Sequence, residues 1–385
     1  MSGATAAGQP AGFVPGLAMS RGVAALMVAL LHAGQATYAN GLKQPAVLLP
    51  SRPEPGSCWL WEDALRMLGN GHGAVNFFFV LSGFVLALMI QRGPPDIASS
   101  ARSFFIGRIF RLYPAVIVTV LAIAGLYWAT GRGLAAAETY APFNVLLNAL
   151  LLRTDIDGVM WTLQLEMIAA PLIFFGYWGW RRWGAPILIV PHLLFLALSF
   201  APGFYRFIGL PSAAVPAYAF TGGLITSLYA RPLIERLRPS GPWLGVFVAG
   251  FLLSRPLLGW WSPWAILFEV AFAGGAVAMI AWGTFAWRGN TRLAALARYY
   301  GRISYSFYLL HPISLIVIYD LQEPLGAAIS AGAPPWLLMF GLFIGSTAVV
   351  TPLAHLQYRF VEQPGIALGR AWQRSRRPVT PVYDP

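Results

Sequence analysis

Residues 19–34 read Met-Ser-Arg-Gly-Val-Ala-Ala-Leu-Met-Val-Ala-Leu-Leu-His-Ala-Gly, an apolar stretch that contains one arginine and one histidine. Arg21 and His32 are eleven residues apart, so on a helix both side chains share one face, roughly 16 Å apart along the axis. This spacing predicts that Arg21 lies near one membrane surface and His32 near the bilayer midplane. An ionisable group at that depth is costly and usually faces the protein interior for a functional reason.

Similar apolar stretches recur along the whole chain. The 385 residues are 57% hydrophobic and only 10% charged, whereas a soluble protein carries about 25% charged residues. The sequence therefore predicts an all-α, polytopic membrane protein with about ten transmembrane helices. The predicted segments are residues 20–38, 74–91, 113–129, 160–179, 185–200, 213–230, 242–258, 264–286, 303–319 and 336–357.

The charged residues indicate orientation rather than a nucleic-acid partner. The net charge is +12, but the basic residues lie in short clusters between the apolar stretches, so no nucleic-acid surface is expected. Most of the 26 lysines and arginines fall in the tails and in the loops after even-numbered segments, which predicts that both termini are cytoplasmic. We expect a mobile N-terminal tail over 1–18, a transmembrane domain over 19–364 and a basic cytoplasmic tail over 365–385.

The single cysteine limits the chemistry that is possible. Cys58 has no second cysteine to pair with, which excludes an intramolecular disulfide and a multi-cysteine metal site. No metal is expected.

The first segment has two interpretations. A neutral imidazole at His32 can act as a general base toward a hydroxyl group, while Arg21 can bind a phosphate or carboxylate. Alternatively, His32 hydrogen-bonds a neighbouring helix and Arg21 extends to the lipid headgroups. We favour the functional interpretation for His32 and the structural one for Arg21.

Two further polar groups lie in or beside apolar segments. Arg108 and Arg111 are three residues apart and are expected on one helical face toward the cytoplasm. Such a pair suits a polyanion such as a nucleotide diphosphate, and equally lipid phosphates or control of topology. Glu166 lies about six residues, or roughly 9 Å, inside its segment. It needs a partner there, for which Gln164, Arg153 or a substrate are candidates.

The ninth segment combines hydroxyl groups with an imidazole. Ser304, Tyr308 and His311 recur at intervals of four and three residues, so they form a polar stripe that predicts a lined cavity. His311 is expected at a depth similar to that of His32. In the second segment, Ser82-Gly83 predicts a close approach of two helices.

Together these motifs resemble those of the acyltransferase 3 family of bacterial membrane-bound O-acyltransferases. They occur in one order along the chain, as Arg21-x10-His32, Phe77-Phe-Phe-Val-Leu-Ser-Gly-Phe84, Arg108-x-x-Arg111-Leu-Tyr-Pro114, Trp161-Thr-Leu-Gln-Leu-Glu166, Ser304-Tyr-Ser-Phe-Tyr-Leu-Leu-His311 and Tyr358-Arg-Phe-Val-Glu362-Gln-Pro364. Thr162 stands where serine is usual and keeps the hydroxyl group. The acidic residue that typically precedes the first arginine is absent, so Arg21 has no partner nearby in the sequence.

The resemblance implies transfer of an acyl group, commonly acetyl from acetyl-CoA, to a hydroxyl group of a carbohydrate. The acceptor would be an O-antigen, an exopolysaccharide or a lipid-linked sugar at the bacterial inner membrane, with polysaccharide-assembly proteins as possible partners. The resemblance implies three groups of site residues. The catalytic residues would be His32, Glu166 and His311. The CoA-binding residues would be Arg21, Arg108 and Arg111, and the substrate-binding residues Ser82, Trp161 and Tyr308.

Two other classes of protein are weighed against this expectation. Ten spans with buried histidine, glutamate and arginine are also typical of a proton-coupled carrier, which here would export a glycan intermediate. The sequence shows no inverted repeat, which counts against it. A purely structural scaffold leaves the buried His32 and Glu166 unexplained. Dependence on acyl-CoA separates an enzyme from a carrier.

Overall fold

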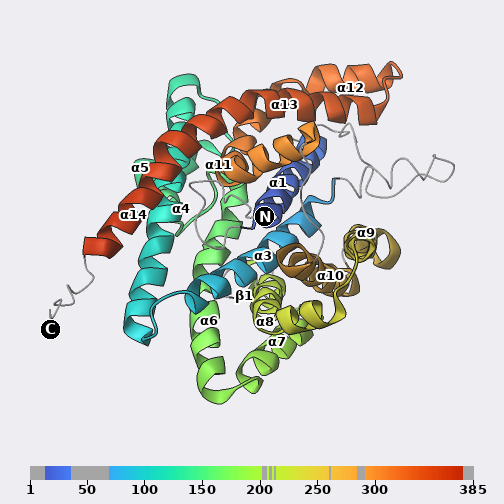
Figure 1. Cartoon of the computed structure of the whole chain (residues 1–385). Helices are drawn as coiled ribbons and strands as arrows, with labels where there is room; N and C mark the ends of the chain where they lie inside the picture. The colour runs from blue at the N-terminus through green and yellow to red at the C-terminus, as the bar shows by residue number, and fades with distance from the viewer. Residues whose placement is uncertain are drawn as a thin grey trace.

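The computed structural model describes residues 14–35, 69–201, 206–207, 210–211, 214–259, 262–283 and 291–375. This part of the chain is almost entirely helical (Figure 1). The elements are α1 (Pro15–Gln35), α3 (Gly71–Gln91), α4 (Ile97–Thr130), η1 (Ala137–Tyr140), α5 (Pro142–Ala149), η2 (Gly158–Met160), α6 (Trp161–Trp183), α7 (Pro186–Ser199), β1 (Arg206–Phe207), β2 (Leu210–Pro211), α8 (Ala214–Leu237), α9 (Gly241–Leu258), α10 (Pro263–Trp282), α11 (Arg292–Asp320), α12 (Gln322–Ser330), α13 (Pro335–Gln357), η3 (Tyr358–Glu362) and α14 (Gln363–Ser375).

The all-helical fold class is confirmed. Each of the ten predicted segments falls on a helix. In the described residues, seven helices are both long enough and apolar enough to cross a membrane, and α7 is a shorter apolar helix. The two strands, β1 and β2, form only a two-residue antiparallel pair. Cys58 lies outside the described residues.

Helices α1 and α11 form a close, parallel pair. A Cβ atom added to Gly22 would lie 2.5 Å from the backbone nitrogen of Gly301, and one added to Gly301 would lie 2.2 Å from the carbonyl oxygen of Ala18. Small residues therefore allow the two backbones to touch. Further along both helices, His32 contacts His311. Because both contacts follow the same direction along each chain, the two helices run parallel.

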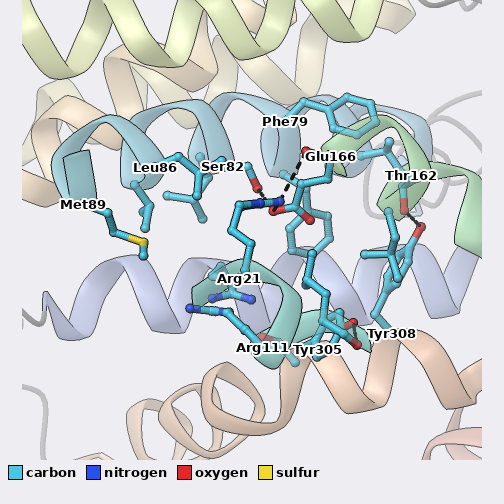
Figure 2. Close-up of a pocket in the computed structure, with 18 of the residues that line it drawn as sticks. Arg21, Phe79, Ser82, Leu86, Met89, Arg111, Thr162, Glu166, Tyr305 and Tyr308 are labelled. Atoms are coloured by element: carbon cyan, nitrogen blue, oxygen red, sulfur yellow. Dashed lines mark hydrogen bonds and ion pairs between the residues drawn. The ribbon is translucent and has the colours of Figure 1, made fainter. Parts of the chain in front are cut away.

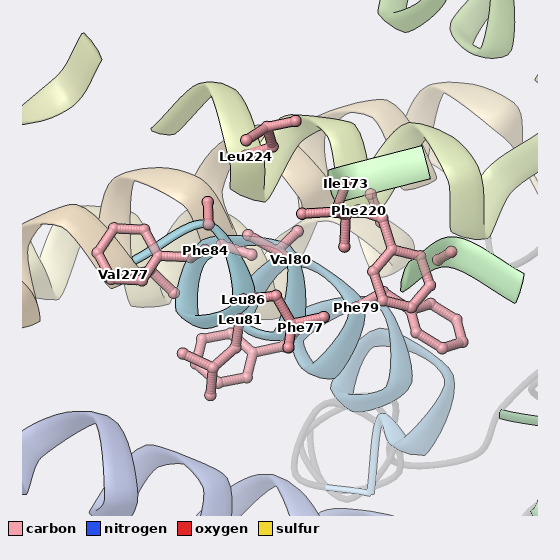
Figure 3. Close-up of a cluster of buried hydrophobic side chains, with 14 of the residues drawn as sticks. Phe77, Phe79, Val80, Leu81, Phe84, Leu86, Ile173, Phe220, Leu224 and Val277 are labelled. Carbon is pink, nitrogen blue, oxygen red and sulfur yellow. The ribbon is translucent and has the colours of Figure 1, made fainter. Parts of the chain in front are cut away.

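Helix α3 lies at the centre of the helical bundle and packs closely on α8 (Figure 1). A Cβ atom on Gly83 would lie 2.1 Å from the carbonyl oxygen of Phe220, and one on Gly223 would lie 2.0 Å from that of Val80. The close helix approach predicted at Ser82-Gly83 is thus confirmed. Figure 3 shows Val80 and Phe84 of α3 within the hydrophobic cluster that fills this junction.

Helix α4 is longer than the predicted segment 113–129 because it begins at Ile97. The side chain of Asp96 caps its first turn by accepting a hydrogen bond from the backbone N–H of Ser99, at 2.8 Å. The stretch around Arg108, which precedes the predicted segment, is therefore part of the same helix. Figure 1 shows α14 alongside α4.

The C-terminal region corrects a second expectation. Residues 365–375, the first part of the expected basic tail, belong to helix α14. Gly369 of this helix packs on Phe110 of α4, and the Gln373 side chain donates a hydrogen bond to the carbonyl oxygen of Ser103, at 2.9 Å. At the other end of the chain, α1 begins at Pro15, inside the predicted N-terminal tail.

We predict that Gly83→Ala lowers the stability of the protein by about 1–3 kcal/mol, because the added methyl group would meet the backbone of α8, which cannot move without displacing that helix. Thermal unfolding in detergent measures the change. Gly125→Ala is the matched control, since a Cβ atom at Gly125 meets nothing within 4 Å. Equal melting temperatures for the two variants would contradict the prediction.

Candidate functional site

The two histidines predicted at similar depth are in direct contact. The Nδ1 atom of His32 lies 2.7 Å from the Nε2 atom of His311, and the two ring planes are 7° apart. Stacked rings cannot bring nitrogens this close, so the rings meet edge to edge in nearly one plane. This is the geometry of an N–H···N hydrogen bond between imidazoles. His311 is only 2% exposed.

The hydrogen bonds around this pair assign its protons. The Nδ1 atom of His311 lies 2.6 Å from the carbonyl oxygen of Tyr308. A carbonyl oxygen only accepts, so this nitrogen carries the proton, and in a neutral ring the Nε2 atom is then an acceptor. The His32 Nδ1 atom must therefore donate. His32 consequently keeps an unprotonated Nε2 atom, which is the atom that a general base needs.

Helix α1 begins earlier than the predicted segment 20–38, at Pro15, because proline is favoured in the first turn of a helix. Within the described part of the chain α1 covers Pro15–Gln35, and His32 lies in its last turn. The histidine pair therefore lies toward the end of α1 that is opposite to Arg21.

A cavity of about 100 Å³ is lined by Arg21 and by Tyr308, the neighbour of His311. It is lined from α1, α3, α4, α6 and α11 (Figure 2). The side chains that line it include six of the nine expected site residues, which are Arg21, Ser82, Arg108, Arg111, Glu166 and Tyr308. Neither histidine lines the cavity, but the ring of Tyr308 contacts that of His311, with a centroid separation of 5.6 Å.

Glu166 is held by two other helices. Its carboxylate lies 3.2 Å from the Nη2 atom of Arg108 and accepts a hydrogen bond of 3.1 Å from the hydroxyl group of Ser82. Gln164, one of the predicted partners, does not contact this carboxylate: its side chain donates to the carbonyl oxygen of Leu151.

The second predicted partner of Glu166 also lies elsewhere. Arg153 contacts Asp155 and Asn144 at an exposed position.

Arg108 is buried and lines the same cavity as Arg111, so the two share one helical face, and this face points into the protein. Only 4% of its side chain is exposed, and it binds both the carboxylate and the backbone carbonyl oxygen of Glu166. An arginine already paired in this way is poorly placed to bind a donor phosphate. Its geometry suits a different role, in which it fixes Glu166 at the cavity wall.

Arg21 and Arg111 form the basic part of the cavity. Their guanidinium groups approach each other in Figure 2 and interact electrostatically, with Glu166 and Glu362 also in range of Arg21. These two carboxylates supply the partners that the sequence near Arg21 lacks. Two close arginines that are not fully neutralised attract a phosphate or carboxylate.

Glu362 is a residue whose role the sequence analysis missed. It is 4% exposed and accepts a hydrogen bond of 3.0 Å from the hydroxyl group of Ser306. It ends the π-helical segment η3, and such segments often occur at functional sites. The closing motif Tyr358–Pro364 was the available signal for it.

Aromatic and hydroxyl groups form the part of the cavity nearest the histidines. Thr162 donates a hydrogen bond of 3.0 Å to the Tyr308 hydroxyl group, which in turn donates to the carbonyl oxygen of Val159, at 3.2 Å. Phe78 packs edge-on against Tyr308. Trp161, an expected substrate contact, does not line the cavity and packs on Phe79 instead.

A second buried ion pair lies apart from this cavity. Arg255 of α9 and Glu269 of α10 are 2.7 Å apart, with exposures of 4% and 0%. The side-chain amides of Asn70 and Asn76 donate to the two carboxylate oxygens of Glu269. This arrangement neutralises and hydrogen-bonds a buried carboxylate completely, as a structural ion pair requires.

Two other histidines lie outside the cavity and are involved in packing. His192 hydrogen-bonds Thr221, at 2.8 Å, and His355 contacts Tyr299. No group of three or more histidine, cysteine, aspartate or glutamate side chains in the described part of the chain is arranged to hold a metal ion.

Asp157 is a buried carboxyl group next to the Tyr308 end of the cavity. It is 0% exposed. Its Oδ1 atom accepts from the backbone N–H of Val159, and among the described residues its Oδ2 atom has no partner. Burial raises the pKa of Asp157 to about 8 from an ordinary value of 3.8.

The raised pKa predicts a pH-dependent stability. Between pH 4 and pH 8 the folded protein keeps the Asp157 proton that the unfolded chain has lost, so stability falls as pH rises through this window, by up to about 1.4 kcal/mol per pH unit. Asp157→Asn removes the titration. We therefore expect the stability difference between the variant and the parent to shift in favour of the variant when the pH is raised from 4 to 8. Thermal unfolding in detergent at the two pH values measures this shift. A difference independent of pH would contradict this.

Comparison with known proteins gives a consistent result. The sequence profile of the acyltransferase 3 family, described as an acyltransferase domain, matches residues 14–355. Nodulation protein 10 of Rhizobium leguminosarum bv. viciae is 24% identical over 338 residues, which cover 76% of this chain and 82% of that protein. Exopolysaccharide production protein ExoZ of Rhizobium meliloti (strain 1021) is 26% identical over 327 residues, which cover 78% of this chain and 91% of that protein. No solved structure gives a significant match.

Proposed function

The chain belongs to the acyltransferase 3 family and is a membrane O-acyltransferase, and we propose that it transfers an acetyl group from acetyl-CoA to a hydroxyl group of a carbohydrate. The observation that carries the proposal is the His32–His311 pair, whose hydrogen bonds leave the Nε2 atom of His32 unprotonated. The similarity to an exopolysaccharide production protein supports a surface or lipid-linked glycan as the acceptor. We place the enzyme in the bacterial inner membrane, with both termini in the cytoplasm.

The acyl donor is expected to enter the cavity from the end at which Arg21 and Arg111 lie. Its phosphate groups carry negative charge, and these two arginines provide the positive charge in the cavity that is not already bound to Glu166. The thioester then extends past Ser82 toward Tyr308. In this arrangement Arg108 positions Glu166 rather than binding the donor, which revises its expected role.

The transfer step begins at His32. Its Nε2 atom accepts the proton of the acceptor hydroxyl group, and the resulting oxygen nucleophile attacks the thioester carbonyl carbon. A C–O bond forms, the C–S bond breaks, and the thiolate of CoA takes the proton back from His32. His311 holds the His32 ring by accepting from its Nδ1 atom, and it stabilises the positive charge that develops on that ring.

A route through an acyl-histidine uses the same nitrogen. In that case the Nε2 atom of His32 attacks the thioester carbonyl carbon, the C–S bond breaks and the CoA thiolate leaves. The acceptor hydroxyl oxygen then attacks the acyl carbon, the C–N bond to His32 breaks, and the hydroxyl proton passes to the thiolate. The two routes differ in one observable: only the second leaves labelled acyl group on the protein when no acceptor is present.

The function is tested with membranes that contain the protein and acetyl-labelled CoA. We expect base-labile label in the polysaccharide or lipid-linked fraction. His32→Ala should lower the rate by about 10²–10⁴-fold, because a general base is lost. His192→Ala is the control, since His192 lies outside the cavity and bonds Thr221. Full activity of His32→Ala would reject the assignment, and a parent protein that labels no fraction would reject acetyl-CoA as the donor.

The role of His311 has a test of its own. His311→Leu removes the acceptor for the His32 Nδ1 proton, and we expect a rate loss of at least about tenfold with little change in the KM for the donor. In His311→Gln the side-chain carbonyl oxygen can accept the same proton, so part of the rate should return. Equal rates for the leucine and glutamine variants would show that His311 does not act through this hydrogen bond.

A further inference from the structure

A second cavity of about 250 Å³ lies next to the first. It is bounded by the C-terminal end of α3, the first turns of α4, and α14. The residues that α14 contributes are spaced three and four apart, so a single face of this helix borders the space. They are Ile366, Gly369, Arg370 and Gln373.

The two cavities are neighbours that share part of their walls. Met89, Gly107 and Arg111 line both of them. Arg111 therefore stands where one space meets the other, and the absence of a side chain at Gly107 keeps the wall thin there. A molecule that is long, narrow at one end and bulky at the other can occupy both spaces.

The walls of the second cavity suit an anion. Among the described residues that line it, none is a carboxylate, and two are arginines, Arg111 and Arg370. Ser100 is among the residues that line this cavity and is 2% exposed, and its hydroxyl group is buried without a hydrogen-bond partner among the described residues. A buried hydroxyl group without a partner is costly and favours a polar ligand.

We propose that this second cavity binds the phosphorylated nucleotide end of the acyl-CoA donor, with Arg370 as a phosphate ligand. The inference rests on the proposed function and extends it to a part of the chain, α14, that lies beyond the region matched by the family. The nucleotide is the bulky, charged end of the donor and occupies the larger space. The narrow pantetheine arm passes Arg111 into the smaller cavity, toward the histidine pair.

The experiment compares two donors that differ only in the nucleotide. Acetyl-CoA and acetyl-pantetheine carry the same thioester, but the second lacks the nucleotide and its phosphates. For Arg370→Gln we expect the KM for acetyl-CoA to rise about tenfold or more, because a charge-assisted contact is lost. The kcat, and all constants for acetyl-pantetheine, should stay the same. Arg374→Gln is the control, since Arg374 lies one turn further along α14 and does not line the cavity.

Several outcomes would overturn the inference. Arg370→Gln could behave like Arg374→Gln, or it could raise the KM for both donors equally. An effect that follows the content of anionic lipid in the vesicles, rather than the donor, would assign Arg370 to lipid headgroups. If the parent protein transfers acetyl from neither donor, the proposed donor itself fails. Calorimetric titration of the purified protein with CoA then still tests the cavity, because Arg370→Gln must weaken CoA binding.

Discussion

The cost of burying polar groups among membrane-spanning helices governs this structure. Inside such helices an imidazole, guanidinium or carboxylate group has no water to bind, so each one must find a partner on another helix. His32 finds His311, Arg108 finds Glu166, and Arg255 finds Glu269. These contacts connect α1 with α11, α4 with α6, and α9 with α10, so the polar pairs also determine which helices are neighbours.

The two buried ion pairs differ in a way that separates structure from chemistry. The carboxylate of Glu269 contacts an arginine and accepts hydrogen bonds from two asparagine amides, so both of its oxygens are bound by protein groups. Glu166 lies at the wall of a cavity, and the Nε atom of its partner Arg108 has no partner among the described residues. The first pair closes a helix junction, whereas the second leaves polar groups directed at a space that a ligand can fill.

Much of the fold could be predicted because hydropathy is local. All ten apolar segments fall on helices, and the glycine contact at Gly83 follows from its small-residue motif. Helix ends were less certain. Pro15 at the start of α1 and the capping residue Asp96 before α4 are both local signals in the sequence. The signal at Asp96 was not used, because the charged residues that follow it moved the predicted start of the apolar segment to residue 113. Gly365 and Gly369, four residues apart, were the missed signal for the docking of α14 on α4.

The site was predicted as a set of residue types but not as a set of contacts. Arg21, Glu166 and Tyr308, which belong to three different motifs, line one cavity. The partner of Glu166 depends on how α4, α3 and α6 pack, and no local spacing encodes it. The same holds for Asn70 and Arg255, which are far apart in the chain and meet at one carboxylate.

The hydrogen bond from His311 to the Tyr308 carbonyl oxygen has a consequence for energy coupling. An amide oxygen has no proton to pass on, so the chain of hydrogen bonds that starts at His32 ends there. In the reaction proposed above, a proton taken up by the Nε2 atom of His32 therefore cannot pass through His311 to another helix. The histidine pair holds a proton between two steps of one reaction, in contrast to proteins whose buried histidines and carboxylates form a continuous proton path across the bilayer.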